Sequence, residues 1–179
     1  MLDATIAEQT QAFLDEFGAA LSEGDIARAR EMFQDDCYWR DLVAFTWNLK
    51  TVEGKDQVED MLRQQLDRVR PSDWALADGE LPSEEDGVTT AWIRFETEVG
   101  RGFGLVRLKE GRIWTLLTTL VELKGFEEPA GFNRPLGAKH GAGKNRESWS
   151  EERAREEAEL GYDTQPYCVI VGGGQGGIA

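Results

Sequence analysis

The sequence predicts an α+β fold in which three helices come first and pack on a curved, mainly antiparallel sheet. Two observations lead to this prediction. Apolar residues recur at helical spacing in three segments before residue 71, and they alternate with polar residues in much of the segment from 73 to 124. Helices followed by a run of strands, rather than helices alternating with strands, are typical of this fold class.

The helices have recognisable starts and ends. Thr5 is followed three residues later by a glutamate, so a capping box begins the first helix, and Gly24 ends it. Asp25 is a suitable N-cap for a shorter second helix. The third predicted helix follows Gly54, carries one apolar stripe and ends before Pro71.

The strands follow from period-two patterning. The segment from Val88 to Val99 alternates apolar and polar side chains, and glycines between 100 and 104 allow a hairpin or a bulge. Residues 103–108 and 112–123 form two more strands joined by a tight turn. The last strand carries leucine and valine on both faces, so we expect it to lie centrally and to be covered on both sides.

Composition excludes several classes of partner. The 179 residues include 34 acidic and 20 basic side chains, for a formal net charge of −14, which argues against nucleic-acid binding. No stretch approaches the roughly 20 apolar residues of a membrane span. The acidic start lacks the basic residues of a secretory signal, so we expect a cytoplasmic protein with Cys37 and Cys168 as reduced thiols.

The chain changes character after residue 125. Residues 126–166 are rich in glycine and charge, and Ser148 with Glu151 forms a second capping box, so we expect a linker with a short charged helix. Residues 1–125 form the predicted domain, and residues 167–179 begin another one. The only histidine, His140, lies in the linker, so we expect no His-Asp dyad in the domain, and the sequence predicts no metal site.

The last segment carries a glycine motif. A short apolar strand after Pro166 leads into G-x-G-x-x-G, with its glycines at Gly172, Gly174 and Gly177. Such glycines permit a sharp turn, close approach of a pyrophosphate and tight packing of the next helix. The acidic residue that holds the ribose, about 20 residues further on, lies beyond Ala179. We therefore expect a truncated start of a Rossmann-type domain that binds no dinucleotide tightly; a flexible glycine-rich tail is the alternative.

Two families are similar to parts of the chain. Residues 167–179 resemble the opening of the FAD-binding domain of flavin-containing monooxygenase-like oxidoreductases. Residues 5–124 resemble the SnoaL-like, nuclear-transport-factor-2-like fold in their element order and in three motifs, Tyr38-Trp39-Arg40-Asp41, Thr46-Trp47 and Val52-Glu53-Gly54. The second resemblance implies a cone-shaped domain. Together they imply an oxidoreductase that uses FAD and NAD(P)H when whole, while this fragment alone is inactive.

The resemblance also supplies a candidate catalytic residue. Asp41 stands at a position similar to the general base of ketosteroid-isomerase-like members. The sequence places Trp39, Phe45 and Trp47 near it, and an aromatic surrounding would favour the neutral carboxyl group. The alternatives are that Asp41 caps the irregular segment that follows it or pairs with Arg94.

Three functions therefore remain open. The first is an accessory domain that assists assembly of the downstream flavin domain of the same chain or shelters a small organic substrate. The second is a small pocket enzyme, an isomerase or dehydratase, with Asp41 as its base. The third is a non-catalytic dimerisation module, because Trp92 stands among charged residues on one strand face and suggests an interface with another subunit or with the flavin domain. We expect a homodimer.

Overall fold

The computed structural model describes residues 5–134, 147–165 and 171–174. The chain divides into two compact units, Met1–Arg134 and Pro135–Ala179, and each is described by itself. Cys168, His140 and Gly177 lie outside the described residues. The predicted boundaries at residues 125 and 166 remain predictions.

The three predicted helices are present in the first unit. They are α1 (Ile6–Ser22), α2 (Ile26–Glu31) and α3 (Gly54–Val69). Thr5 accepts a hydrogen bond from the Glu8 amide while the Glu8 carboxylate accepts one from the Thr5 amide, which completes the predicted capping box. Asp25 caps α2 by accepting from the Arg28 amide. The α3 helix ends at Arg70, whose φ of 44° lies in the left-handed region.

One seven-stranded sheet follows the order β2-β1-β7-β6-β5-β3, and β4 pairs with β5. The strands are β1 (Phe33–Leu42), β2 (Leu49–Glu53), β3 (Ser72–Leu76), β4 (Ser83–Glu85), β5 (Val88–Glu96), β6 (Gly100–Lys109) and β7 (Arg112–Leu123). The β1 and β7 strands run parallel, and every other pair is antiparallel. The α+β class and the mainly antiparallel sheet are therefore confirmed.

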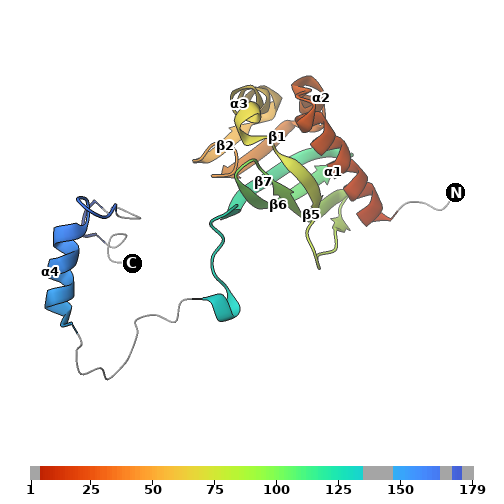
Figure 1. The fold of residues 1–179 in the computed structure, drawn as a ribbon. Helices are drawn as coiled ribbons and strands as arrows, with labels where there is room; N and C mark the ends of the chain where they lie inside the picture. The colour runs from red at the N-terminus through yellow and green to blue at the C-terminus, as the bar shows by residue number, and fades with distance from the viewer. Residues whose placement is uncertain (1–4, 135–146, 166–170, 175–179) are drawn as a thin grey trace. The chain divides into compact units, whose positions relative to one another are not determined.

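The last strand is central, as predicted, and within the described residues of the first unit helices cover it on one side only; its cover on both sides stays a prediction. Figure 1 shows the three helices on one side of the sheet, where α1 packs against β3 and α3 against β1. No helix of the first unit's described residues covers the other side. Apolar residues on both faces of a strand indicate only that both faces favour burial, and they do not say which element provides it.

Aromatic side chains fill the space between helices and sheet. Phe17, Phe33, Trp39, Phe45 and Phe95 are fully buried. The rings contact one another in turn, with Trp39 edge-on to Phe45 at 4.9 Å between centroids. Trp74 stacks on Phe95 at 4.7 Å. Such close-packed rings make the interior a solid core.

Glycines on β6 make room for this core. Gly102 and Gly104 lie at buried positions of β6 that face the core. The register with β7 shifts between Arg101 and Gly102, and this shift is the bulge that the sequence allowed. A Cβ atom on Gly102 would overlap the Phe95 ring, and one on Gly104 would overlap the Leu117 carbonyl. A side chain at either position is therefore incompatible with the present packing.

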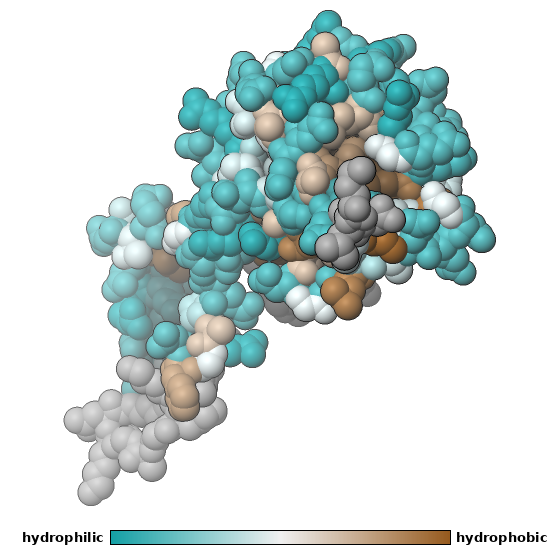
Figure 2. Space-filling model, turned by 90° about the vertical axis from the view of Figure 1, so that its right-hand side faces the viewer, coloured by the Kyte–Doolittle hydropathy of each residue, from teal (hydrophilic) through white to brown (hydrophobic). Residues whose placement is uncertain are grey.

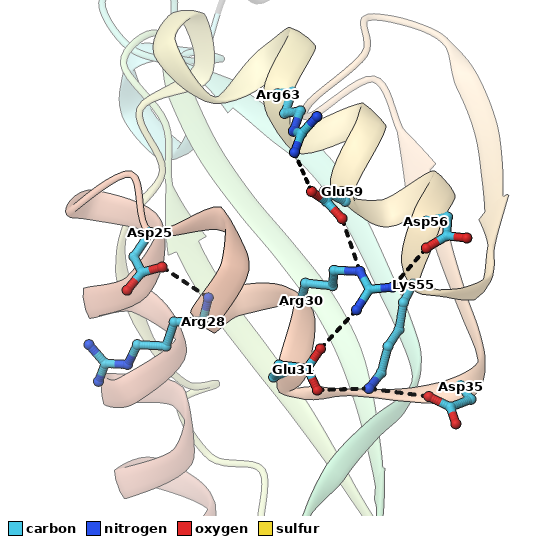
Figure 3. A network of polar contacts seen from close by, with 9 residues as sticks. All are labelled: Asp25, Arg28, Arg30, Glu31, Asp35, Lys55, Asp56, Glu59 and Arg63. Carbon is cyan, nitrogen blue, oxygen red and sulfur yellow. Dashed lines mark hydrogen bonds and ion pairs between the residues drawn. The ribbon is translucent and has the colours of Figure 1, made fainter.

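A polar network joins α2, β1 and α3 on the surface of the domain (Figure 3). Arg30 lies 2.7 Å from Asp56 and 2.9 Å from Glu59. Lys55, which is largely buried, lies 3.2 Å from both Glu31 and Asp35. Because most of the carboxylates are exposed, each pair contributes about 0–1 kcal/mol, and the network mainly fixes the relative placement of its elements.

The surface of the domain on the α1 side is mostly polar. Figure 2 views the α1 side of the domain, where hydrophilic residues predominate and apolar ones gather in a smaller area.

In the second unit, α4 (Trp149–Glu159) begins at the predicted capping box of Ser148 and Glu151. None of the helices in the described ranges has the length and apolar character to cross a bilayer. Cys37 is buried and free, and burial raises the pKa of its thiol.

We predict that Gly102→Ala destabilises the domain by about 1–3 kcal/mol, because the added methyl group forces the Phe95 ring out of its position. Urea unfolding followed by circular dichroism measures this change. Gly173→Ala is the matched control, since a Cβ atom there meets nothing within 4 Å and no positive φ restricts the position. Equal unfolding midpoints for Gly102→Ala and the unmodified chain would contradict the packing argument.

Candidate functional site

Asp41 lies near the end of β1 and points into the domain. The β1 strand alternates, so Cys37, Trp39 and Asp41 face inward while Tyr38 and Arg40 face outward. Its side chain is completely buried, which is unusual for a carboxylate without a cationic partner. A buried carboxylate requires hydrogen-bond donors around it, and the structure provides them.

Donors from three residues surround the Asp41 carboxylate. The Phe45 amide lies 3.1 Å from both carboxylate oxygens. The Thr46 amide and the Thr46 hydroxyl each donate to Oδ2 at 2.8 Å. On the other side, the Thr118 hydroxyl donates to Oδ1 at 2.8 Å. Charge-assisted hydrogen bonds of this kind are about twice as strong as neutral ones.

The Thr118 contact connects the carboxylate to the aromatic core. Thr118 stands on β7 directly beside Asp41 in the parallel register, and it is fully buried. Its hydroxyl accepts a hydrogen bond from the Trp39 indole Nε1 at 2.9 Å while it donates to Asp41. The indole, the hydroxyl and the carboxylate thus form a chain in which each polar atom is satisfied.

The loop that Asp41 holds is strained. Val43 and Trp47 have φ values of 59° and 53°, in the left-handed region that side chains rarely adopt. Such residues cost on the order of 1–3 kcal/mol each. The Val43 amide donates to the Asn48 carbonyl at 3.0 Å and closes the loop, while Asp41 holds the residues between. We call residues 43–48 the strained loop.

This geometry bears on the predicted role of Asp41 as a base. A carboxylate has about four lone-pair sites, and the donors from Phe45, Thr46 and Thr118 occupy them. The contacts correspond to the alternative in which Asp41 caps the irregular segment. The pairing with Arg94 is not formed, because Arg94 lies on the opposite face of the sheet. Catalysis by Asp41 stays a prediction.

Sequence reasoning did not identify the residues that satisfy Asp41. Thr46 entered only as part of a family motif, because a contact between an aspartate and a threonine five residues later has no standard local signature. Thr118 lies 77 residues away, and its contact depends on the parallel pairing of β1 with β7. No local pattern predicts that pairing. Of the predicted aromatic surroundings, Trp39 and Phe45 are buried, whereas Trp47 is 55% exposed.

The predicted cofactor glycines lie partly within the described residues. Gly172 has a φ of 106°, which glycine adopts more readily than other residues. A Cβ atom built on Gly172 or Gly174 meets nothing within 4 Å, so the described part of this segment forms no cradle for a pyrophosphate. These residues by themselves do not fit FAD or NAD(P)H. In the described residues, no group of His, Cys, Asp and Glu side chains could hold a metal ion.

The uncovered side of the sheet, which we call the outer face, is the second candidate site. Strand register places the side chains at its middle in three rows across β5, β6, β7, β1 and β2, and charged rows of β5, β6 and β7 flank them on both sides. The rows are, in this strand order, Trp92-Leu105-Leu117-Arg40-Thr51, Arg94-Phe103-Thr119-Leu42-Leu49 and Thr90-Arg107-Thr115-Tyr38-Glu53. Trp92 stacks on Phe103 at 5.2 Å and is 40% exposed. The outer face is therefore apolar at its centre.

We predict that Asp41→Asn destabilises the domain by about 1–3 kcal/mol, because the amide group presents a donor to backbone donors that then remain unsatisfied. Hydrogen exchange of the Phe45 and Thr46 amides is expected to accelerate. Asp36→Asn, an exposed position on the same strand, is the matched control and leaves both measurements unchanged. Unaltered protection of the two amides in Asp41→Asn would contradict the role of this carboxylate.

Comparisons with known proteins concern the fold of the first unit. No family model and no curated protein matches the chain. A putative calcium/calmodulin dependent protein kinase II association domain from Xanthomonas campestris has a TM-score of 0.53 at 12% identity, over 68% of this chain and 91% of that one. A domain of unknown function with a cystatin-like fold from Nostoc punctiforme has a TM-score of 0.52 at 15% identity, over 66% and 80%.

An orange carotenoid protein of Anabaena that binds canthaxanthin has a TM-score of 0.50 at 14% identity, over 68% of this chain and 42% of that one. At such identities these similarities show the fold alone. The first unit has the mixed, curved sheet and the helices of a cystatin-like α+β fold. The curved α+β architecture that the resemblance of residues 5–124 implies is confirmed, and the nuclear-transport-factor-2-like family and flavin-dependent chemistry stay predictions.

Proposed function

We propose that residues 5–124 form a non-catalytic interaction domain that pairs with a second copy of this chain through the outer face. The observation that carries the proposal is the row of Trp92, Leu105 and Leu117 at the centre of a sheet side that no described helix of the first unit covers. Exposed apolar patches with polar surroundings often mark protein–protein contact sites.

The composition of the outer face favours a protein partner. Its three middle rows hold tryptophan, phenylalanine, tyrosine and arginine, which are enriched in protein interfaces, and most charged side chains of the face lie in the flanking rows. Arg94 forms no ion pair with any residue of the described ranges, and Arg40 donates only to the Thr51 hydroxyl. An acidic chain that presents unpaired arginines around an apolar centre has the polar rim of an interface.

Two copies of the outer face complement each other. A two-fold axis that runs along the strands between β6 and β7 places β5 of one copy over the β1–β2 side of the other. Trp92 then faces Arg40 of the partner subunit in the same row, a favourable cation–π pair. At the centre, Leu105 of each copy faces Leu117 of the partner subunit. Self-complementarity of this kind favours a second copy over an unrelated partner.

The interior supports a role without catalysis. Six aromatic rings occupy the space in which a pocket enzyme would hold its substrate, namely those of Phe17, Phe33, Trp39, Phe45, Trp74 and Phe95. The lone pairs of the Asp41 carboxylate accept hydrogen bonds from the strained loop and from Thr118. A carboxylate whose lone pairs all accept hydrogen bonds from the protein has none left to take a proton from a substrate.

A second candidate rests on the glycine string. Gly172, Gly174 and Gly177 have the sequence spacing of a dinucleotide-binding turn, and this spacing favours the domain as an accessory part of an oxidoreductase that binds FAD and NAD(P)H. Its test is flavin absorbance that co-purifies with a longer natural form of the chain. Absence of bound flavin from such a form, or a natural form that ends at Ala179, would contradict it.

We predict that Trp92→Lys raises the dimer dissociation constant at least about tenfold, because it removes the central aromatic ring and places like charge opposite Arg40 of the partner subunit. Analytical ultracentrifugation over a concentration series measures the change. Leu81→Lys is the matched control, since Leu81 is exposed in a loop outside the three rows and its replacement leaves pairing unchanged.

Two outcomes would contradict the proposal. One is a monomeric chain at all concentrations, which would leave the outer face to a different occupant such as a flavin domain. The other is a dimer that Trp92→Lys does not weaken, which would place the interface elsewhere. Circular dichroism of each variant confirms that the fold is retained, so that loss of pairing reports on the interface.

A further inference from the structure

A hollow of about 330 Å³ opens beside the strained loop, where β1 ends and α3 and the β5–β6 turn come together. Phe45 and Trp47 of the strained loop line one side, and Gln65 and Arg68 of α3 line another. Val99 of the turn adds an apolar wall. An apolar hollow with a few convergent polar groups is the usual form of a small-molecule site.

Trp47 is held at this hollow by an unfavourable backbone. Its φ of 53° and its 55% exposure mean that a large indole ring faces solvent from a conformation that tryptophan rarely adopts. The preceding residue, Thr46, is fixed by two hydrogen bonds to Asp41. The buried carboxylate therefore fixes the backbone from which Trp47 projects before any ligand arrives, and such preorganisation lowers the cost of binding.

Arg68 provides an unpaired positive charge. It stands three residues after Gln65, so both side chains lie on the same side of α3. Among the described residues, Arg68 forms no ion pair or hydrogen bond. The carboxylate of Glu98, which lies in the same turn as Val99, is 3.6 Å from Arg70 instead. A free guanidinium group in an acidic chain is suited to a carboxylate, which it binds through two parallel hydrogen bonds.

We infer that this hollow binds a small planar aromatic carboxylate. The ring of the ligand stacks on Trp47, its carboxylate pairs with Arg68, and the Gln65 amide donates a further hydrogen bond. The volume, near the lower end of the roughly 300–1,000 Å³ of ligand pockets, suits one or two fused rings. None of these residues belongs to the three rows of the outer face, so ligand binding and pairing can be tested separately.

The probe is 2-naphthoate, titrated into the isotope-labelled full chain while amide chemical shifts are recorded. We expect saturable shifts confined to residues 44–47, 65–69 and 97–99. The neutral analogue 2-naphthamide has the same rings without the charge. We expect its affinity to be lower by a factor of about ten or more. Equal binding of the two compounds, or shifts spread over the whole domain, would overturn the inference.

Variants assign the two contacts. Arg68→Gln and Trp47→Ala are each expected to weaken 2-naphthoate binding about tenfold or more, and Trp47→Phe to restore part of the loss. Arg63→Gln on the same helix and Trp149→Ala in the second unit are the matched controls and keep full affinity. A folded Arg68→Gln variant that binds 2-naphthoate as tightly as the unmodified chain overturns the inference, whatever the result for Trp47.

Discussion

The buried carboxylate of Asp41 is the constraint on which this end of the domain depends. It lies where an inward-facing strand position ends and an irregular loop begins, and water cannot reach it. Its hydrogen bonds to Phe45, Thr46 and Thr118 offset the cost of burying charge and the cost of two left-handed residues. Without that carboxylate, the strained loop would lose the contacts that fix its shape.

The aromatic core sets a second constraint on the rest of the sheet. Phe95 and Trp74 stack where a side chain on β6 would otherwise project, so Gly102 is required by its neighbours. This packing gives the domain a solid interior. The two candidate binding sites proposed above, the outer face and the hollow beside the strained loop, both lie at the surface of the domain.

The sequence predicted local features well and long-range ones poorly, for physical reasons. The capping boxes at Thr5 and Ser148 depend on residues three apart, and both are present. The period-two pattern correctly turned Trp92 toward the outer face. By contrast, the contact of Asp41 with Thr118 was not foreseen. It depends on which strands become neighbours, and alternation within one strand carries no such information.

The parallel pairing of β1 with β7 has a consequence for how the domain folds. The hydrogen bonds from Thr118 to Asp41 and from Trp39 to Thr118 join residues 77 and 79 apart along the chain. On the ribosome, the loop after β1 is therefore synthesised long before the strand that completes its support. Contacts between distant residues form late and slow the overall rate of folding. This end of the domain is expected to be the last to become ordered in a newly made chain.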